Sequence, residues 1–172
     1  MTTTTSNSTV LAFDLTYNAY GGSHSQMINI LKHIDLYKAD KFIIYTNEQN
    51  YEEFKKFENP RIIFKIIRLA SISTLTRVIW VQLLLPFHLI IDGVSLLFSP
   101  SNFSPILSFT KKMQWIGTVG PFEKEFFREL SLAQKMSHVA NKYVMIFSSH
   151  TSNHVIFESE YTRDLFKTKY SF

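Results

Sequence analysis

Short apolar runs alternate with longer stretches of helical periodicity along most of this chain. The short runs are bounded by polar residues or glycine, which is typical of strands buried in a parallel sheet. We therefore expect strands at residues 9–14, 41–46, 61–67, 94–98, 112–118 and 154–157. Apolar positions that recur every three or four residues predict helices from Ser25, at 50–57, at 73–90, at 123–147 and at 161–169.

The regular alternation of strands and helices predicts an α/β fold, a Rossmann-like doubly wound and mainly parallel sheet in a single domain. We assign this domain to residues 10–172, because no linker, repeat or change of composition interrupts that range. Residues 1–9 are Thr, Ser and Asn after the first Met, which predicts a disordered polar lead and not a signal peptide. Pro86, inside the third helical stretch, either bends that helix or ends it.

The segment 78–98 carries almost no full charge and approaches the length of a membrane-spanning helix. Several of its residues would be costly or helix-breaking in lipid. These are Gln82, Pro86, His88, Asp92 and Gly93. We therefore expect a buried helix, a turn at Asp92-Gly93 and a central strand in place of a membrane span.

The net charge of +4 comes from bases that alternate with acids and form no patch, which argues against nucleic acid as a partner. The mild basic excess falls late in the chain and suits an anionic membrane surface or a phosphorylated substrate. The absence of cysteine excludes disulfides and thiolate metal sites. With 172 residues, 45% of them hydrophobic, the chain has the size and composition of one well-packed domain.

The ligands of an open parallel sheet bind outside the carboxyl ends of its strands, so the loops that follow the strands are the candidate sites. The first loop carries paired glycines, which let the backbone approach a ligand, and His24, the best-placed histidine for acid–base chemistry. The candidate substrate-binding residues are Gly21, Gly22, Ser23, His24, Asn102, Gly120, Pro121 and Phe122. The same loops are also consistent with ordinary turn chemistry, and no catalytic residue is assigned.

Several motifs that would define a chemistry are absent from the sequence. There is no G-x-G-x-x-G or phosphate-loop spacing, which argues against a dehydrogenase or an NTPase. The six histidines show no metal-ligand spacing, and no G-x-S-x-G marks a hydrolase nucleophile. We expect neither a metal nor a bound cofactor.

Four segments, taken in order, carry a resemblance to a known family. They are Phe13-Asp14 followed by Gly21-Gly22-Ser23, Asp92-Gly-Val-Ser-Leu-Leu-Phe-Ser-Pro100, Trp115-Ile-Gly-Thr-Val-Gly-Pro-Phe122, and Val155-Ile-Phe-Glu-Ser-Glu-Tyr-Thr-Arg163. Together they resemble the N-terminal domain of family-four GT-B glycosyltransferases over residues 10–169. The last segment is the most specific match.

The resemblance implies acceptor recognition during transfer of a sugar from a nucleotide-sugar to a cell-envelope or lipid-linked glycan, with retention and without a metal. It implies that Gly21, Gly22 and Ser23 approach the donor phosphates or the acceptor. The donor-binding C-terminal domain of the family is absent from this sequence, so we expect a separate donor-binding domain as a partner and little catalysis by this chain alone. The expected location is cytoplasmic, with peripheral contact at the inner membrane face.

One loop departs from the family pattern. Many members place a histidine or an asparagine where this chain has residues 118–122, so an acid–base or sugar-orienting group is not expected there. Three other interpretations stay open: a binding or regulatory half-enzyme, an inactive remnant, and an unrelated Rossmann-like binder of small molecules.

Overall fold

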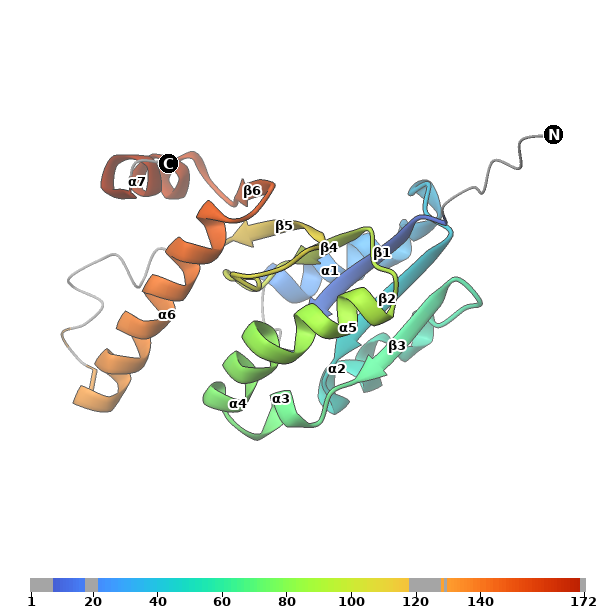
Figure 1. Ribbon diagram of the computed structural model, residues 1–172, viewed down its shortest axis with the longest axis horizontal. Coiled ribbons are helices and arrows are strands. Elements are labelled where there is room, and N and C mark those ends of the chain that lie inside the picture. Colours follow the sequence, from blue (N-terminus) through green and yellow to red (C-terminus); the bar gives the residue numbers. More distant parts are fainter. Residues whose placement is uncertain (1–7, 18–21, 118–127, 129, 171–172) are drawn as a thin grey trace.

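The computed structural model describes residues 8–17, 22–117, 128 and 130–170 of the chain. One sheet of six parallel strands runs through the molecule in the order β3-β2-β1-β4-β5-β6 (Figure 1). The strands are β1 (Val10–Leu15), β2 (Lys41–Thr46), β3 (Ile62–Ile66), β4 (Leu96–Ser99), β5 (Lys111–Ile116) and β6 (His154–Phe157). The predicted α/β, Rossmann-like doubly wound fold is confirmed, and the strand order reverses between β1 and β4.

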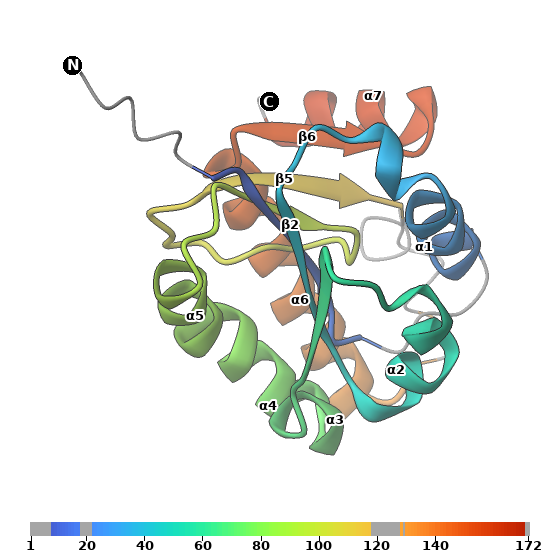
Figure 2. The ribbon, with the colours of Figure 1, turned by 90° about the vertical axis from the view of Figure 1, so that its right-hand side faces the viewer.

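Helices cover both faces of the sheet, as Figure 2 shows. On one face lie α1 (Gly22–Lys32), η1 (Ile34–Leu36), α2 (Glu48–Phe54) and η2 (Lys55–Phe57). On the other face lie α3 (Leu69–Ile72), α4 (Thr74–Ile79), the π-helical turn η3 (Trp80–Leu84), α5 (Leu85–Ile91) and α6 (Leu132–His150). The last helix, α7 (Glu160–Tyr170), follows β6 and packs Phe166 against Ile116 and Met145.

The sheet has a separate apolar core on each face, because successive side chains of a strand point to opposite sides. On the α1 and α2 side, Met27 and Phe54 pack with Phe42 of β2. On the other side, Trp80, Val81, Leu85 and Leu89 pack with strand residues Ala12, Ile43 and Leu97. Strands covered on both faces need apolar residues at nearly every position, which is why uninterrupted apolar runs identified them in the sequence.

The long helical stretch continues past Pro86 to Ile91, so the proline does not end it. The turn before the proline is π-helical, and the Leu85 amide bonds the carbonyl oxygen of Trp80 five residues earlier. Pro86 has no N–H to donate, so the backbone must change its hydrogen-bond pattern at this point.

The prediction that segment 78–98 is buried is correct for only one face of the helix. Asp92-Gly93 forms the expected turn, with Gly93 in the left-handed region at φ 63°, and β4 is the expected central strand. The helix itself is long and apolar enough to cross a membrane over Thr74–Ile91, and only 22% of that stretch is buried. Side chains on the side away from the sheet have no core to enter, which the sequence pattern did not reveal.

Helices α1 and α6 begin at positions other than those predicted. Helix α1 begins at Gly22 and not at Ser25, so Ser23 and Ser25 lie inside the helix. Helix α6 begins at Leu132, after Arg128 and Leu130, which are not helical; the prediction had started it at residue 123. A reciprocal capping box between Ser131 and Gln134 fixes that start.

Candidate functional site

Two buried polar side chains lie at the carboxyl ends of β1 and β4, where the strand order reverses. β1 and β4 pair in register up to Phe13 and Phe98, so Asp14 and Ser99 follow at the end of the paired stretch. By the alternation of side chains, both face the layer formed by α4, α5 and α6. Both are fully buried. Doubly wound sheets bind their ligands at this position, so these two side chains are candidates for a ligand site.

Asp14 is a carboxyl group that the fold holds in an unfavourable environment. Its Oδ1 accepts hydrogen bonds from the Thr16 hydroxyl at 2.7 Å and from the Thr16 amide at 3.2 Å. Its Oδ2 is buried and has no hydrogen-bond partner among the described residues. Burial raises the pKa of Asp14, while the Arg77 charge and the Thr16 hydrogen bonds lower it by less. A carboxyl group in this state is a candidate for proton exchange or for binding a ligand.

Arg77 extends from α4 and places its guanidinium group between two aromatic rings. The guanidinium carbon lies 4.8 Å from the centre of the Phe103 ring and 5.4 Å from that of the Tyr17 ring. Burial lowers the pKa of Arg77 and the charge of Asp14 raises it, and the group stays a cation because its intrinsic pKa is so high. Its Nε is buried and has no acceptor among the described residues. Arg77 therefore offers a desolvated positive charge with an unused donor.

Two further buried polar atoms on this face, Trp80 Nε1 and Ser99 Oγ, also have no hydrogen-bond partner among the described residues. The Trp80 ring lies 5.8 Å from the ring of Tyr45, and Tyr45 stands beside Asp14 in the register of β1 and β2. Buried polar groups in folded proteins are nearly always paired, so several without partners call for an explanation. We call Asp14, Arg77, Trp80 and Ser99 the switch-point cluster. Three of its four members can donate a hydrogen bond, which suits an anionic or hydroxylated ligand.

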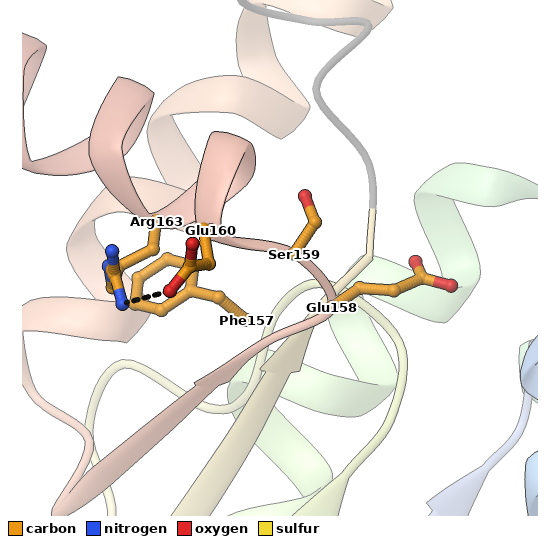
Figure 3. A pocket seen from close by; sticks show the side chains of 5 residues that line it. All are labelled: Phe157, Glu158, Ser159, Glu160 and Arg163. Carbon is orange, nitrogen blue, oxygen red and sulfur yellow. Dashed lines mark hydrogen bonds and ion pairs between the residues drawn. The ribbon is translucent and has the colours of Figure 1, made fainter.

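A surface hollow of about 330 Å³ lies at the same edge of the sheet, where β6 ends and α7 begins. It is lined by Phe157, Glu158, Ser159, Glu160 and Arg163. Figure 3 shows Arg163 and Glu160 beside the Phe157 ring, with Glu158 extended to the other side. Arg163 pairs with Glu160 at 3.5 Å, whereas the Glu158 carboxylate has no ion pair among the described residues. A site of this kind is able to bind a sugar: the aromatic ring packs against the C–H face of the sugar, and the carboxylates and the guanidinium group bond the sugar hydroxyls.

The carboxyl end of β5 adjoins this hollow. A Cβ atom added to Gly117 would lie 2.7 Å from Glu158 Oε2, so the glycine and the carboxylate are in close contact. Strands are spaced by about 4.8 Å, so the hollow and the switch-point cluster lie roughly 10–15 Å apart along one edge. The structure thus brings two groups of polar residues to the edge where sequence reasoning placed the site.

Asn102, a predicted site residue, joins the loop after β4 to the end of β5 through hydrogen bonds. It has a left-handed backbone with φ 64°. Its Oδ1 accepts from the Gly117 amide at 2.8 Å, and its carbonyl oxygen accepts from Gln114 Nε2 at 2.6 Å. The side chain that sequence analysis offered to a substrate is therefore engaged in holding the edge of the sheet together.

Replacing Asn102 with alanine is expected to lower the free energy of unfolding by about 1–2 kcal/mol, because the variant loses the bond to Gly117 and strains the left-handed backbone. Asn102→Asp keeps an acceptor oxygen and tolerance of that backbone, so it should cost less. Urea denaturation of the two variants measures the difference. Equal losses in both would show that Oδ1 contributes nothing.

The residues predicted around the first glycine loop are only partly brought to this edge. Gly22 and Ser23 form the start of α1. His24 was predicted in a loop, but it lies inside that helix. The His24 ring pairs with Glu53 of α2 and stacks on Phe54 with 5.4 Å between ring centres. A role for His24 in chemistry stays a prediction, and its observed contacts join α1 to α2. Gly21, Gly120, Pro121 and Phe122 lie outside the described residues.

Sequence reasoning did not assign a role to the switch-point cluster or to the hollow. One signal was available in each case. Asp14 is the one charged residue in an otherwise apolar strand, and Arg77 is the one charged residue between positions 69 and 91. Glu158 and Arg163 lie in the segment that most resembles the family, although the resemblance did not mark them as ligands. Their roles depend on neighbours that are distant in sequence.

In the part of the chain that the structure describes, no group of three His, Asp or Glu side chains is placed to hold a metal ion. No protein-family model, no curated protein and no solved structure matches the chain. The evidence for a function is therefore the geometry of the sheet edge, together with the resemblance of four sequence segments to the glycosyltransferase family.

Proposed function

We propose that this domain binds the acceptor in transfer of a sugar from a nucleotide-sugar to a cell-envelope or lipid-linked glycan, as the N-terminal half of a GT-B glycosyltransferase. The hollow lined by Phe157, Glu158, Ser159, Glu160 and Arg163 is the observation that carries the proposal. Its side chains have the chemistry of a sugar site, and it lies in the segment with the most specific resemblance to the family. Its place beyond the carboxyl ends of β5 and β6 supports the same function.

In this proposal the described residues bind and orient, and no described residue is assigned to the chemical step. Glu158 accepts hydrogen bonds from acceptor hydroxyls, and the ring of Phe157 supports the face of the sugar. The switch-point cluster, with Arg77 as its cation, faces an anionic group such as the phosphate of a carrier or donor. A separate donor-binding domain would hold the nucleotide-sugar, because a two-substrate reaction needs both partners fixed in register.

A second candidate is a Rossmann-like binder of a small anion that transfers no sugar. The unpartnered polar atoms of the switch-point cluster favour it, since they suit an anion whether or not a sugar is attached. The two candidates differ in which residues matter. An anion binder depends on Arg77 and is indifferent to Glu158.

Replacing Glu158 with glutamine is expected to weaken binding of an acceptor sugar about tenfold, because the hydroxyls lose a charged acceptor. Isothermal titration with methyl glycosides of glucose, galactose, mannose and N-acetylglucosamine measures the change. The matched control is Glu52→Gln, which removes an exposed carboxylate on α2 and should leave binding unchanged. Sugar binding that is equal in both variants would contradict the assigned site.

A transfer assay tests whether sugar transfer requires a donor-binding domain in addition to this chain. Uridine and guanosine diphosphate sugars are offered to the chain with and without a GT-B donor-binding domain. Little or no turnover is expected from the 172-residue chain alone. Tight nucleotide-sugar binding with turnover by this chain by itself would overturn the proposal that it is the acceptor half.

A further inference from the structure

The outward side of helices α3, α4, η3 and α5 is apolar and exposed. From Leu75 onward its side chains recur every three or four residues and form one stripe along α4, η3 and α5. We call these residues the apolar face: Ile72, Leu75, Ile79, Leu83, Leu84, Phe87, Ile90 and Ile91. Phe87 is 65% exposed and Ile91 is 77% exposed. A contiguous apolar surface of this length marks a contact with a partner or a membrane.

The same helix is attached to the sheet by its other side. Trp80, Val81, Leu85 and Leu89 are buried with the strands. A helix that crossed a bilayer over Thr74–Ile91 would have to leave this core and expose it. The packing therefore favours a helix that lies along a surface over one that spans a membrane.

The connection from β4 to β5 extends the apolar face. Gln82 of η3 donates to the Ser104 carbonyl at 3.1 Å and accepts from the Ile106 amide at 2.9 Å, so the connection lies beside the helix. Beyond that contact, Phe109 is 95% exposed, and the exposed Lys111 follows it. An exposed phenylalanine beside a lysine has the composition of an interfacial contact, in which the apolar ring enters the interface and the lysine meets the headgroups.

Exposed carboxylates are distributed unequally between the two faces of the sheet. Residues 69–91, 93–117 and 130–157 contain no Asp or Glu. Asp92, at the end of α5, is paired with Lys65 at 2.5 Å. The carboxylates Asp35, Asp40, Glu48, Glu52, Glu53 and Glu58 lie in or beside the elements of the α1 and α2 side. Figure 2 shows α4 and α5 on the side opposite to α1 and α2, and Val144 of α6 packs against the same core as Leu85 and Leu89 of α5.

We propose that the domain docks on an anionic lipid bilayer through the apolar face, with Phe109 and Lys111 at one end of the contact. Lys135 of α6, on the same side of the sheet, adds positive charge for the headgroups. Helix α6 also exposes apolar side chains along its length: Leu132, Met136, Val139, Tyr143 and Phe147. An amphipathic, cationic surface whose described residues in 69–91, 93–117 and 130–157 include no carboxylate is complementary to anionic headgroups over an apolar interior.

A second copy of the chain is the other occupant to consider. A two-fold contact would place this surface against its own copy, so Lys111 and Lys135 would face like charges, with no carboxylate in the described residues 69–91, 93–117 and 130–157 to offset them. A bilayer containing anionic lipid supplies the missing negative charge. This inference deepens the proposed function, because a lipid-linked acceptor is presented at a membrane, but it does not depend on sugar transfer.

Flotation with vesicles tests the docking surface. Wild-type chain is expected to bind vesicles of phosphatidylcholine with phosphatidylglycerol, to bind pure phosphatidylcholine much less, and to release at high salt. The combined variant Leu83→Ser, Phe87→Ser and Ile91→Ser should reduce binding at least about tenfold, because each apolar side chain removed from the interface costs a large fraction of a tenfold change. Its residues are exposed, and circular dichroism checks that the fold is kept.

The matched control is Leu36→Ser with Tyr37→Ser, which removes exposed apolar side chains on the α1 and α2 side and should leave vesicle binding unchanged. No vesicle binding by the wild type, or equal binding by the combined variant, would overturn the proposal. A wild-type dimer in analytical ultracentrifugation that the combined variant dissociates would assign the face to a second copy. Resistance to extraction from membranes by alkaline carbonate would assign it to a spanning helix. Vesicle binding without acceptor-sugar binding would uphold this inference while the proposed function failed.

Discussion

Replacing Arg77 with methionine is expected to lower the free energy of unfolding by about 3 kcal/mol at neutral pH. Methionine keeps part of the packing between Phe103 and Tyr17 but removes the positive charge that Asp14 faces. The carboxylate then stays buried with only the Thr16 hydrogen bonds to stabilise it. Removing a positive charge that offsets a buried carboxylate is costly, because the carboxylate loses a compensating charge that water cannot replace.

The loss should shrink as the pH falls, and the sign follows from the pKa of Asp14. Burial holds that pKa above its unfolded value, and removal of Arg77 takes away an effect that lowers it. A carboxyl group with a raised folded pKa contributes most to stability below its unfolded pKa, and loses that contribution as the pH rises through the folded pKa. Urea denaturation at about pH 5 and about pH 7 measures the difference.

Two further variants separate this explanation from a general loss of packing. Arg68→Met removes an exposed arginine paired with Glu48, and it should change stability by less than about 0.5 kcal/mol. Adding Asp14→Asn to Arg77→Met should recover most of the loss, because no buried charge remains. A double variant that is no more stable than Arg77→Met alone would mean that charge is not the cause. If the cluster binds an anion, Arg77→Met should also abolish that binding, whereas Arg68→Met should not.

Replacing Leu89 with alanine should lower the free energy of unfolding by about 3 kcal/mol, whereas Ile90→Ala should change it by less than about 0.5 kcal/mol. The two residues are adjacent on α5. Leu89 is fully buried in the core that contains Leu97, and Ile90 is 53% exposed on the apolar face. Leu89→Ala leaves a cavity that the packed sheet cannot close, while Ile90→Ala removes a side chain that touches water.

Chemical denaturation of both variants without lipid measures the contrast. Equal losses would show that both sides of the helix are packed in solution, which would remove the free surface on which vesicle docking depends. A large loss for Ile90→Ala alone would contradict the burial of Leu89 under the sheet. The pair thus tests, on one helix, which side the tertiary structure uses for the core.

Some differences between prediction and structure were avoidable, because the sequence contained a signal for the correct position. Ser131 and Gln134 have the spacing of a capping box, and that signal would have started the sixth α-helix at Leu132 instead of residue 123. The start of α1 at Gly22 carries no comparable signal, because glycine is a poor helix former and the serines that follow it are residues typical of an N-cap. The start of a helix is predictable from the sequence where a capping motif specifies the hydrogen bonds, and it is ambiguous where no such motif is present.

The sequence by itself determined the strands, their parallel pairing with helices between them, and the turn at Asp92-Gly93. These features depend on side-chain periodicity and on backbone conformation, which act between near neighbours. It also directed attention to the carboxyl edge of the sheet, because the connections of a doubly wound fold place ligands there.

Only the tertiary structure decided which polar residues meet at that edge. Asp14 and Arg77 come from different elements, and they interact because β1 lies at the centre of the sheet while α4 covers its end. The tertiary structure also decided that Leu89 enters the core and Ile90 does not, although both are aliphatic. A hydrophobic pattern gives the same preference for burial to every apolar residue, and only the packing of a finite sheet determines which of them it can cover.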